Sequence, residues 1–415
     1  MIYFLIPKTN LFTYTKLDFK DSEEYPKAFI SPSLSYYLCN IKEKINIHEK
    51  EWDIYKKYTN PYEYIHTIIP NKKKSISKYK PLSRSYFKMI EIINIFKLND
   101  FFFNTIKLSM NMNINEPKYI LKPNRTPINT FHLAEGPGGF IEAIVELRKN
   151  TLDKYVGMTI LDNKDDYNIP AWKKSEQFLK DNPNVSIENG IDNTGNILNI
   201  DNFIYCKNKY ASSMDLITGD GGFDFSMDFN KQEIIISRLL YGQVAYALCL
   251  QKYGGSFILK IFDSFMLHTI DLIYLLSSFY EKVYISKPQT SRYANSEKYI
   301  ICKNFLFTSC EHFYPFLLKN FKIMNQTPHF VYRFLSISIS NHFLSKIEEY
   351  NSIFGQQQIE NIYYTISLIE TKNKIEKIDH LIRNNIQKCV HWCIKYGIPY
   401  NQIINTNSFD GISRV

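Results

Sequence analysis

The chain has no apolar run suited to cross a membrane and no leader of the secretory type. Its longest apolar stretch, 265–280, is interrupted by His268 and Asp271, which the hydrocarbon core of a bilayer disfavours. The first six residues lack the basic segment and the length of a signal peptide. We therefore expect a soluble protein, cytoplasmic (in a host cytoplasm or a virion if the origin is viral) or nuclear in a cell.

Cysteine is sparse and scattered, with seven copies in 415 residues. An odd, dispersed set is typical of reduced thiols inside a cell rather than of a disulfide framework. Cys389 and Cys393, with His391 between them, have a spacing that suggests zinc, but no second ligand pair is near them. A half-buried apolar helix face explains the same spacing, and we expect no metal in the functional site.

Net charge is small for a chain of this size. Fifty basic against 41 acidic residues give +9 and a pI near 8.9, which suits a polyanionic partner without establishing one. The 31 tyrosines and 30 phenylalanines accompany many Asn, Ile and Lys residues and indicate an AT-rich genome, so aromatics alone predict no binding surface. The 45% hydrophobic content predicts a real core.

A glycine-rich turn at 131–140 marks the centre of the chain. Its sequence is Phe-His-Leu-Ala-Glu-Gly-Pro-Gly-Gly-Phe, which predicts a strand, a tight loop and the start of a helix. Such a loop lets backbone approach a nucleotide-like ligand, where a Cβ would collide or forbid the turn. The spacing fails the dinucleotide fingerprint, and no Lys-Ser/Thr pair follows, so nicotinamide cofactors and a phosphate-binding P-loop are disfavoured.

Strands and helices alternate after this loop. The pattern predicts strands at 155–159, 185–188, 214–218, 256–260, 283–286 and 298–302, and helices at 172–179, 232–250 and 265–279. A helix from Ser83 or Ser85 to Phe96 precedes them, and helices at 343–354, 357–368 and 375–396 follow. This order predicts an α/β fold with a parallel sheet covered on both faces and a ligand at the carboxyl ends of the strands.

Three polar residues sit where strands end or begin: Asp220, Lys260 and Glu297. A lysine at the end of a buried strand is costly unless it is paired or used, and a structural ion pair with Asp220 would account for it equally well. From its position alone, Lys88 on the helix after Ser85 is interpreted as an ordinary surface lysine. The lysine run 72–74, continued by Lys78 and Lys80, is either a solvated loop or a phosphate-contacting arm.

Six pieces carry a resemblance to a known family. They lie at 84–88 (Arg-Ser-Tyr-Phe-Lys), 136–140 (Gly-Pro-Gly-Gly-Phe), 190–195 (Gly-Ile-Asp-Asn-Thr-Gly), 215–223 (ending Gly-Asp-Gly-Gly-Phe), 254–260 (Gly-Gly-Ser-Phe-Ile-Leu-Lys) and 287–299. In this order they resemble the FtsJ-like, S-adenosylmethionine-dependent RNA 2'-O-methyltransferases. The similarity is greatest to the Adrift-type group, which contains the mRNA cap methyltransferases of eukaryotes and large DNA viruses.

The resemblance implies a Rossmann-like methyltransferase sheet, mostly parallel, with seven strands of which the last is antiparallel. It covers 81–305, which leaves an N-terminal extension at 1–80 and a helical C-terminal extension at 306–415 packed on the catalytic domain. It also implies S-adenosylmethionine as the cofactor.

A Lys-Asp-Lys-Glu catalytic tetrad is the most specific implication, and it falls on Lys88, Asp220, Lys260 and Glu297. A ribose 2'-hydroxyl attacks a sulfonium methyl only as it loses its proton, and a neutral amine can take that proton. Burial and a second lysine favour the neutral amine, whereas the two carboxylates oppose it. We assign Lys260 as the base or hydroxyl-positioning group, oriented by the other three.

The remaining implied contacts are less specific. The cofactor contacts are Gly136, Pro137, Gly138, Gly139, Phe140 and Asp192, and the substrate contacts are Arg84, Lys287, Ser291 and Arg292. Asp192 would bind adenine or ribose, although a plain surface-loop acid is its other interpretation. Thr159, Asp162 and Trp172 are further candidates for the cofactor pocket. One departure is His132, where many relatives have an acid that Glu135 replaces here.

The leading functional hypothesis is 2'-O-methylation of a cap-proximal nucleotide of mRNA, with capped RNA as partner and other capping or transcription proteins as further partners. Two alternatives stay open. One is the same chemistry on ribosomal or transfer RNA, and the other is a catalytically inactive RNA-binding subunit. An intact tetrad disfavours the second, because a decayed domain would be expected to lose one of its members.

Overall fold

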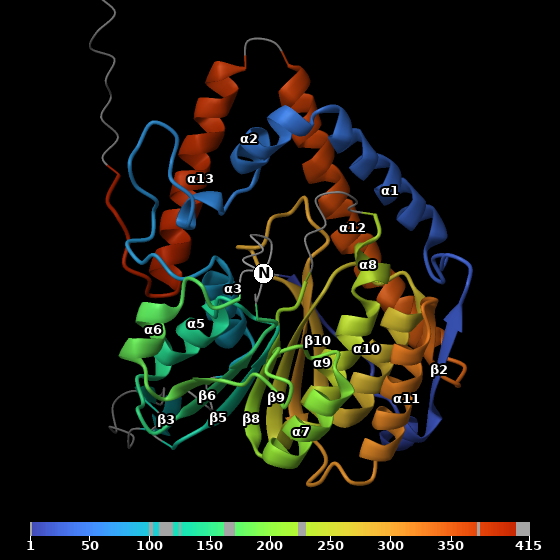
Figure 1. Cartoon of the computed structure of the whole chain (residues 1–415). Coiled ribbons are helices and arrows are strands. Elements are labelled where there is room, and N and C mark those ends of the chain that lie inside the picture. Colours follow the sequence, from blue (N-terminus) through green and yellow to red (C-terminus); the bar gives the residue numbers. More distant parts are fainter. Residues whose placement is uncertain are drawn as a thin grey trace, which may run out of the picture.

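The computed structural model describes residues 2–98, 103–107, 119–123, 126–161, 171–222, 230–371 and 374–403. At its centre lies an eight-stranded sheet in the order β1-β10-β11-β9-β8-β5-β6-β7 (Figure 1). The strands are β1 (Ile2–Leu5), β5 (Asn129–Leu133), β6 (Lys154–Met158), β7 (Val185–Ile187), β8 (Met214–Gly219), β9 (Gln251–Ile261), β10 (Tyr280–Lys287) and β11 (Lys298–Phe305).

Strands β5 to β9 pair in parallel, whereas β11 is antiparallel to both of its neighbours, β9 and β10. The predicted mostly parallel sheet with an antiparallel final strand is therefore confirmed. The N-terminal strand β1 pairs antiparallel with β10 and adds an eighth strand to the seven that were expected. That strand was not predicted.

Side chains of the central strands are buried on both faces, as a sheet covered by helices requires. In β9, Phe257 and Leu259 join one apolar cluster and Ile258 joins the other. Helices α3 (Ser85–Ile95), α5 (Gly139–Arg148) and α6 (Glu176–Asp181) contribute to the cluster of Ile258. Helices α7 (Ile200–Tyr210), α9 (Ser237–Leu250), α10 (Leu267–Phe279) and α11 (Tyr314–Gln326) contribute to the opposite cluster.

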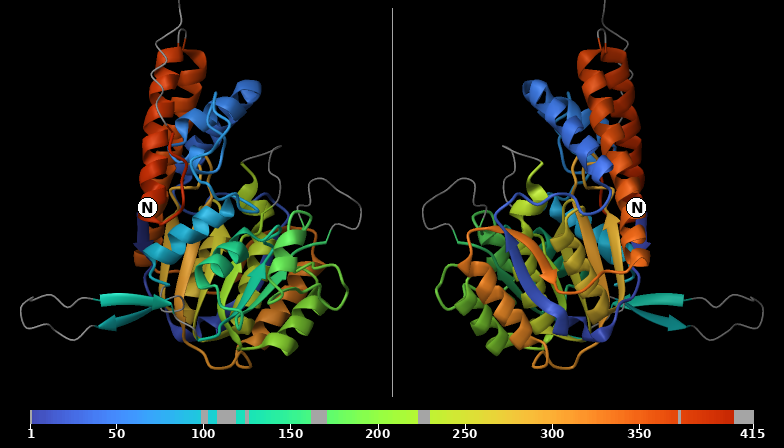
Figure 2. Two further views of the ribbon diagram at one scale, coloured as in Figure 1. Left: turned by 90° about the vertical axis from the view of Figure 1, so that its left-hand side faces the viewer. Right: turned by 90° about the vertical axis from the view of Figure 1, so that its right-hand side faces the viewer.

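The two ends of the chain pack against each other. Helices α1 (Pro32–Ile47) and α2 (Glu49–Thr59) share an apolar cluster with α12 (Asn341–Glu370), in which Trp52 lies among isoleucines. Strand β2 (Leu17–Ser22) pairs with β12 (Phe330–Leu335). Helices α12 and α13 (Ile375–Lys395) rise as a column above the main body (Figure 2), near the loop that leaves β10.

Some elements differ from the sequence pattern. Helices α1 and α2 were not predicted, because each buries only a narrow stripe; in α2 only Trp52 and Thr59 are buried. The two helices expected at 343–354 and 357–368 are one, α12. Gly355 interrupts the apolar pattern but not the helix, and a Cβ there would lie 3.2 Å from Leu34 of α1.

Smaller differences concern element boundaries. The helix expected at 232–250 is divided at Ile236 into α8 (Gln232–Ile235) and α9, and the helix expected at 172–179 is α6, which begins later. The antiparallel hairpin of β3 (Phe103–Lys107) and β4 (Tyr119–Pro123) was not predicted and projects from the body (Figure 2). Among the described residues, no helix is both long and apolar enough to span a bilayer.

Candidate active site

Asp220 and Lys260 are neighbours at the carboxyl ends of two parallel strands. The β8–β9 register pairs Gly219 with Leu259, so the next residue on each strand, Asp220 and Lys260, stands beside the other. Lys260 Nζ donates a hydrogen bond to the Asp220 carbonyl oxygen at 2.7 Å and lies 3.3 Å from Asp220 Oδ1. Both side chains remain only partly accessible to solvent, 13% and 12%, so an incoming ligand can still reach them.

Lys88 and Glu297 form a second ion pair. Lys88, on α3, places Nζ 2.7 Å from Glu297 Oε1 and donates to Oε2 at 2.8 Å. Burial by itself would raise the pKa of the Glu297 carboxyl, but the charges of Lys88 and Lys260, with hydrogen bonds from Lys88 and Ser291, lower that pKa to about 2. Glu297 therefore carries a negative charge at neutral pH.

Tyr299 joins the two pairs. Its hydroxyl donates to Asp220 Oδ1 at 2.9 Å and accepts a longer hydrogen bond from Lys88 Nζ at 3.4 Å. The ring is fully buried, and burial followed by the nearby carboxylates raises the pKa of Tyr299 well above its ordinary value. The structure thus brings Lys88, Asp220, Lys260 and Glu297 into one network, and Tyr299 is a member that sequence reasoning missed.

The glycine-rich loop is held by Glu135. Its Oε1 accepts the backbone N–H groups of Phe140 at 2.5 Å and Ile141 at 3.1 Å, at the start of α5. Its Oε2 accepts the Thr218 hydroxyl at 2.7 Å and lies 3.2 Å from His132 Nδ1. Glu135 thus fastens the loop to β8 and α5, and the buried His132 supports it from behind.

The glycines of this loop are required mainly by the backbone conformation and by close contacts within the protein. Gly138 has φ of +99°, a left-handed conformation that disfavours a side chain. A Cβ at Gly139 would lie 2.2 Å from the hydroxyl oxygens of Ser83 and Ser85, and a Cβ at Gly136 would lie 2.3 Å from the Ala171 carbonyl oxygen. Phe140 points into the core rather than into a cavity and is fully buried.

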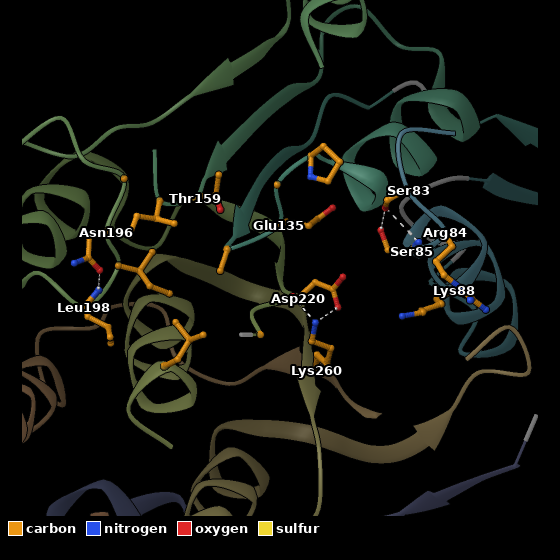
Figure 3. A pocket seen from close by; sticks show the side chains of 18 of the residues that line it. Ser83, Arg84, Ser85, Lys88, Glu135, Thr159, Asn196, Leu198, Asp220 and Lys260 are labelled. Carbon is orange, nitrogen blue, oxygen red and sulfur yellow. Dashed lines mark hydrogen bonds and ion pairs between the residues drawn. The ribbon is translucent and has the colours of Figure 1, made fainter. Parts of the chain in front are cut away.

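A cavity of about 890 Å³ connects the loop to the tetrad. Figure 3 shows Thr159, Asn196 and Leu198 at one end, Asp220 and Lys260 in the middle, and Ser83, Arg84, Ser85 and Lys88 at the other end. From the glycine-rich turn, Ala134, Glu135, Gly136 and Pro137 line the cavity, whereas Gly138, Gly139 and Phe140 are not among its lining residues. The volume is within the range of about 300–1,000 Å³ that encloses small-molecule ligands.

Asp192 is not among the residues that line this cavity. Its Oδ1 accepts the N–H of Thr194 at 2.9 Å and the Asn202 amide at 2.8 Å, and its Oδ2 accepts the Asn199 amide at 2.6 Å. The carboxylate is thus occupied by its own loop and by the start of α7. That loop instead presents Asn196, Ile197 and Leu198 to the cavity.

Asn196, Ile197 and Leu198 were missed by sequence reasoning, as were Ile160, Leu239 and Phe262, which also line the cavity. Five of these six side chains are apolar and, like the single loop amide of Asn196, carry no specific chemical signal, so only the fold could reveal them. Thr159 lines the cavity as anticipated. Asp162 and Phe223 lie outside the described residues.

Arg84 and Arg292 converge on one buried carboxylate, Glu63. Arg292 donates to this carboxylate from Nε at 3.0 Å and from Nη2 at 2.7 Å. Arg84 Nη1 lies 3.5 Å from Glu63 Oε2, and Arg84 Nη2 donates to the Thr290 carbonyl oxygen at 3.0 Å. Burial alone would raise the pKa of Glu63, but the two arginines hold it well below its usual range. Arg84 lines the cavity of the tetrad, whereas Arg292 lies outside it.

Lys287, the last residue of β10, and Ser291, in the loop 288–297, are both buried. Lys287 Nζ donates to the carbonyl oxygens of Asn295 at 2.6 Å and Glu297 at 2.9 Å, and Ser291 Oγ donates to Glu297 Oε1 at 2.7 Å. Both side chains brace the loop that carries Glu297, and neither lines the cavity. Burial lowers the pKa of Lys287 to about 7, despite the opposing charge of Glu297.

Cys389 and Cys393 lie with Trp392 in an apolar cluster, where burial raises the pKa of Cys393 to about 12. In the described part of the chain, no group of three or more His, Cys, Asp or Glu side chains is arranged to hold a metal ion. The lysines at 72–74, 78 and 80 are exposed on a loop whose backbone pairs with residues 399–401.

A parallel sheet with an antiparallel β11, together with a glycine-rich loop and a cavity at the carboxyl edge, is the architecture of the Rossmann-like methyltransferases. Within that class, the chain belongs to the FtsJ-like methyltransferase family, whose model matches residues 81–305.

The curated relatives of this chain are named as cap-specific mRNA methyltransferases. The chain is 32% identical over 289 residues to cap-specific mRNA (nucleoside-2'-O-)-methyltransferase 2 of Pongo abelii, a match that covers 63% of this chain and 34% of that protein. It is 37% identical over 173 residues to the human cap-specific mRNA (nucleoside-2'-O-)-methyltransferase 1, covering 40% and 20%. The match thus spans about a third or less of the length of these relatives.

A relative from Leishmania braziliensis, cap-specific mRNA (nucleoside-2'-O-)-methyltransferase 1, is 36% identical over 180 residues, which cover 41% of this chain and 42% of that protein. Among solved structures, one described as a ribosomal RNA methyltransferase of Plasmodium falciparum is 22% identical, covers 54% of this chain and 98% of its own, and has a TM-score of 0.34.

Proposed function

We propose that this protein transfers a methyl group from S-adenosylmethionine to the ribose 2'-hydroxyl of a cap-proximal nucleotide of mRNA. The observation that carries the proposal is the network at the cavity, in which two lysines and two carboxylates form the ion pairs Lys260–Asp220 and Lys88–Glu297. The names of the curated relatives support capped mRNA as the substrate class.

The cavity offers groups that suit the cofactor. Ile160, Ile197 and Leu198 supply apolar surface for a flat base, and Asn196 supplies an amide beside it. Gly136 and Pro137 expose backbone next to Thr159, where the ribose and methionine parts would lie. Asp192 would act on the cofactor only through the loop that it holds together, because four hydrogen bonds from that loop occupy its carboxylate.

When bound, S-adenosylmethionine supplies a methyl group on a positively charged sulfur, which keeps the electron pair of the broken carbon–sulfur bond. Lys260 Nζ acts as a neutral amine that has first released a proton to water. It takes the proton of the 2'-hydroxyl as that oxygen forms its bond to the methyl carbon, and later releases this proton to water. Asp220 orients Lys260 through its carbonyl and carboxylate oxygens. Lys88 and Glu297 form an ion pair beside Lys260 and Asp220, and this pair keeps the charges of the site balanced.

The substrate side of the cavity is formed by α3. Arg84 and Lys88 line it one helical turn apart, and Ser83 and Ser85 add hydroxyl groups. Arg84 can meet an RNA phosphate here because its side chain is 26% exposed and its guanidinium carries donors beyond those used by Thr290 and Glu63. Lys287 and Ser291 act on the substrate through the loop that they stabilise.

Two other functions are alternatives to this proposal and can be distinguished from it by experiment. The same chemistry on ribosomal or transfer RNA would need the same tetrad, and a catalytically inactive RNA-binding subunit would need only the cavity. The intact pairing of all four tetrad residues favours a working enzyme, because an inactive descendant is under no constraint to keep both ion pairs.

The test uses one short RNA in capped and uncapped forms, beside a transfer RNA and a ribosomal RNA fragment, with isotopically labelled S-adenosylmethionine. Digestion of the product to nucleosides then shows whether the label sits on a ribose. The proposal predicts labelled ribose near the 5' end of capped RNA and little on the others. Equal labelling of capped and uncapped RNA, or labelling of transfer or ribosomal RNA alone, would contradict it.

A further inference from the structure

A second cavity of about 200 Å³ lies on the far side of the loop 288–297. Helices α1, α2 and α12 close it against the loop, and its lining includes Lys42, Trp52, Lys56, Arg292, Ser296 and Gln358. Four of these six residues lie outside the segment 81–305 that matches the family model. The cavity therefore belongs to the extensions of this chain as much as to its FtsJ-like domain.

Three cations converge on this cavity, and among the described residues no acidic side chain lines it. Lys42 is paired with Asp263 at 2.8 Å, Arg292 with Glu63, and Lys56 with Asp53, and none of these three acids is among the residues that line the cavity. The amides of Gln232, Asn295 and Gln358 add hydrogen-bonding groups to the wall. This lining favours a negatively charged, hydrogen-bond-accepting ligand.

Two of the cations, Lys56 and Arg292, can bind a further anion. Within the described residues, Lys56 is paired only with Asp53, which is 75% exposed and three residues earlier on the same helix. Such surface pairs contribute little. Arg292 binds Glu63 through Nε and Nη2, and within the described residues its Nη1 has no partner. A phosphate can therefore engage both side chains while the ion pair with Glu63 remains in place.

The loop 288–297 separates this cavity from the tetrad. Ser291 and Glu297 face the tetrad, whereas Arg292, Asn295 and Ser296 line the second cavity. Arg84 and Arg292, one on each side, share the carboxylate of Glu63. Only the loop 288–297 therefore separates an RNA bound at the tetrad from this cation-lined cavity.

We propose that the second cavity binds the phosphate groups at the 5' end of the RNA whose ribose lies at Lys260. The proposal rests on the function proposed above and names a subsite for it. The volume is below the roughly 300–1,000 Å³ of cavities that enclose whole small molecules, so the cavity holds part of a larger ligand. Because the phosphates are the charged part of an RNA end, they are the part that matches this lining.

The test compares the binding of one short RNA with a 5'-triphosphate or a 5'-hydroxyl, measured by fluorescence anisotropy at several salt concentrations without methyl donor. The test variant is Lys56→Gln. The matched control is Lys57→Gln, the same charge change on the next residue of α2, which does not line the cavity. Inorganic tripolyphosphate serves as a competitor.

Wild-type protein and the Lys57→Gln control are expected to prefer the triphosphate RNA. In Lys56→Gln that preference should fall about five- to tenfold, and the slope of log affinity against log salt should drop by about 0.7 to 1 for the triphosphate RNA only. Tripolyphosphate should abolish the preference without displacing the 5'-hydroxyl RNA.

The absence of any preference in the wild type, or an equal loss in both variants, would overturn the subsite. If tripolyphosphate bound at Lys56 while the RNA showed no preference, the cavity would serve a free anion and the assignment to RNA would be wrong. Because binding is measured without methyl transfer, an inactive protein that keeps a Lys56-dependent preference would contradict the proposed function and leave the subsite intact.

Discussion

The hydroxyl of Tyr299 lies 2.9 Å from Asp220 Oδ1 and 3.4 Å from Lys88 Nζ, so a single tyrosine connects the two ion pairs at the end of the cavity. It comes from β11, the antiparallel strand, and burial raises its pKa well above its ordinary value. It therefore remains protonated and donates to Asp220 over the whole working range of pH. We infer that it is a positioning residue, since it acts through Asp220 and Lys88.

Replacing this hydroxyl tests that role. Tyr299→Phe should lower kcat for methyl transfer about tenfold, because Asp220 loses a hydrogen bond to a charged acceptor, while KM for RNA changes little. The control is Tyr246→Phe on α9, whose buried hydroxyl has no hydrogen-bond partner within the described residues. Single-turnover kinetics measure both. A fall in thermal stability with unchanged kcat would show that Tyr299 is only structural.

The acid dependence of stability tests the Lys88–Glu297 pair. The pKa of Glu297 is about 2 in the folded protein, below its ordinary value of 4.5, so its contribution is complete above pH 4.5 and is lost as the pH falls toward 2. Glu297→Gln should lower the free energy of unfolding by about 3 kcal/mol at pH 7 and by about half of that at pH 3.

Urea unfolding at the two pH values measures this difference. Glu146→Gln is the control, because Glu146 is 46% exposed and paired only at the surface with Lys149. Its effect should stay below about 0.5 kcal/mol at either pH. An equal loss for Glu297→Gln at pH 7 and pH 3 would contradict the low pKa of Glu297.

The packing of the glycine-rich loop on α3 gives a third prediction. Gly139→Ala would bring a Cβ within 2.2 Å of the hydroxyl oxygens of Ser83 and Ser85, and should cost about 1–3 kcal/mol of stability. In a background with Ser83→Ala and Ser85→Ala, the same change should cost clearly less. A double-mutant cycle by urea unfolding measures the coupling. If the cost stayed the same, the contact with the serines would not be what requires glycine here.

The sheet could be predicted because its strands are short apolar runs separated by helical patterns, and both signals are local. The tetrad members could be named because each stands in a motif, at a strand end or at the start of α3. The fold then brings together residues as far apart as Lys88 and Glu297.

Other features have no local signal. Glu63 and Arg292 are 229 positions apart, and only the packing of the N-terminal extension brings them together. Asp192 was expected to meet the cofactor, but its short-range bonds to Thr194 and Asn202 already satisfy its carboxylate. The stripes by which α1 and α2 pack on α12 are too narrow to stand out in a sequence rich in tyrosine and isoleucine.

The most direct test of the central claim is the rate of methyl transfer to capped RNA by Lys260→Ala. Lys252→Ala is the matched control, because Lys252 lies on the same strand, is 55% exposed and pairs with Asp215 away from the cavity. Single-turnover transfer with saturating cofactor should fall about 10²- to 10⁴-fold in Lys260→Ala, with cofactor affinity retained, and stay at the wild-type rate in Lys252→Ala. Wild-type transfer by Lys260→Ala, or an equal loss in both variants, would contradict the assignment of Lys260 as the base.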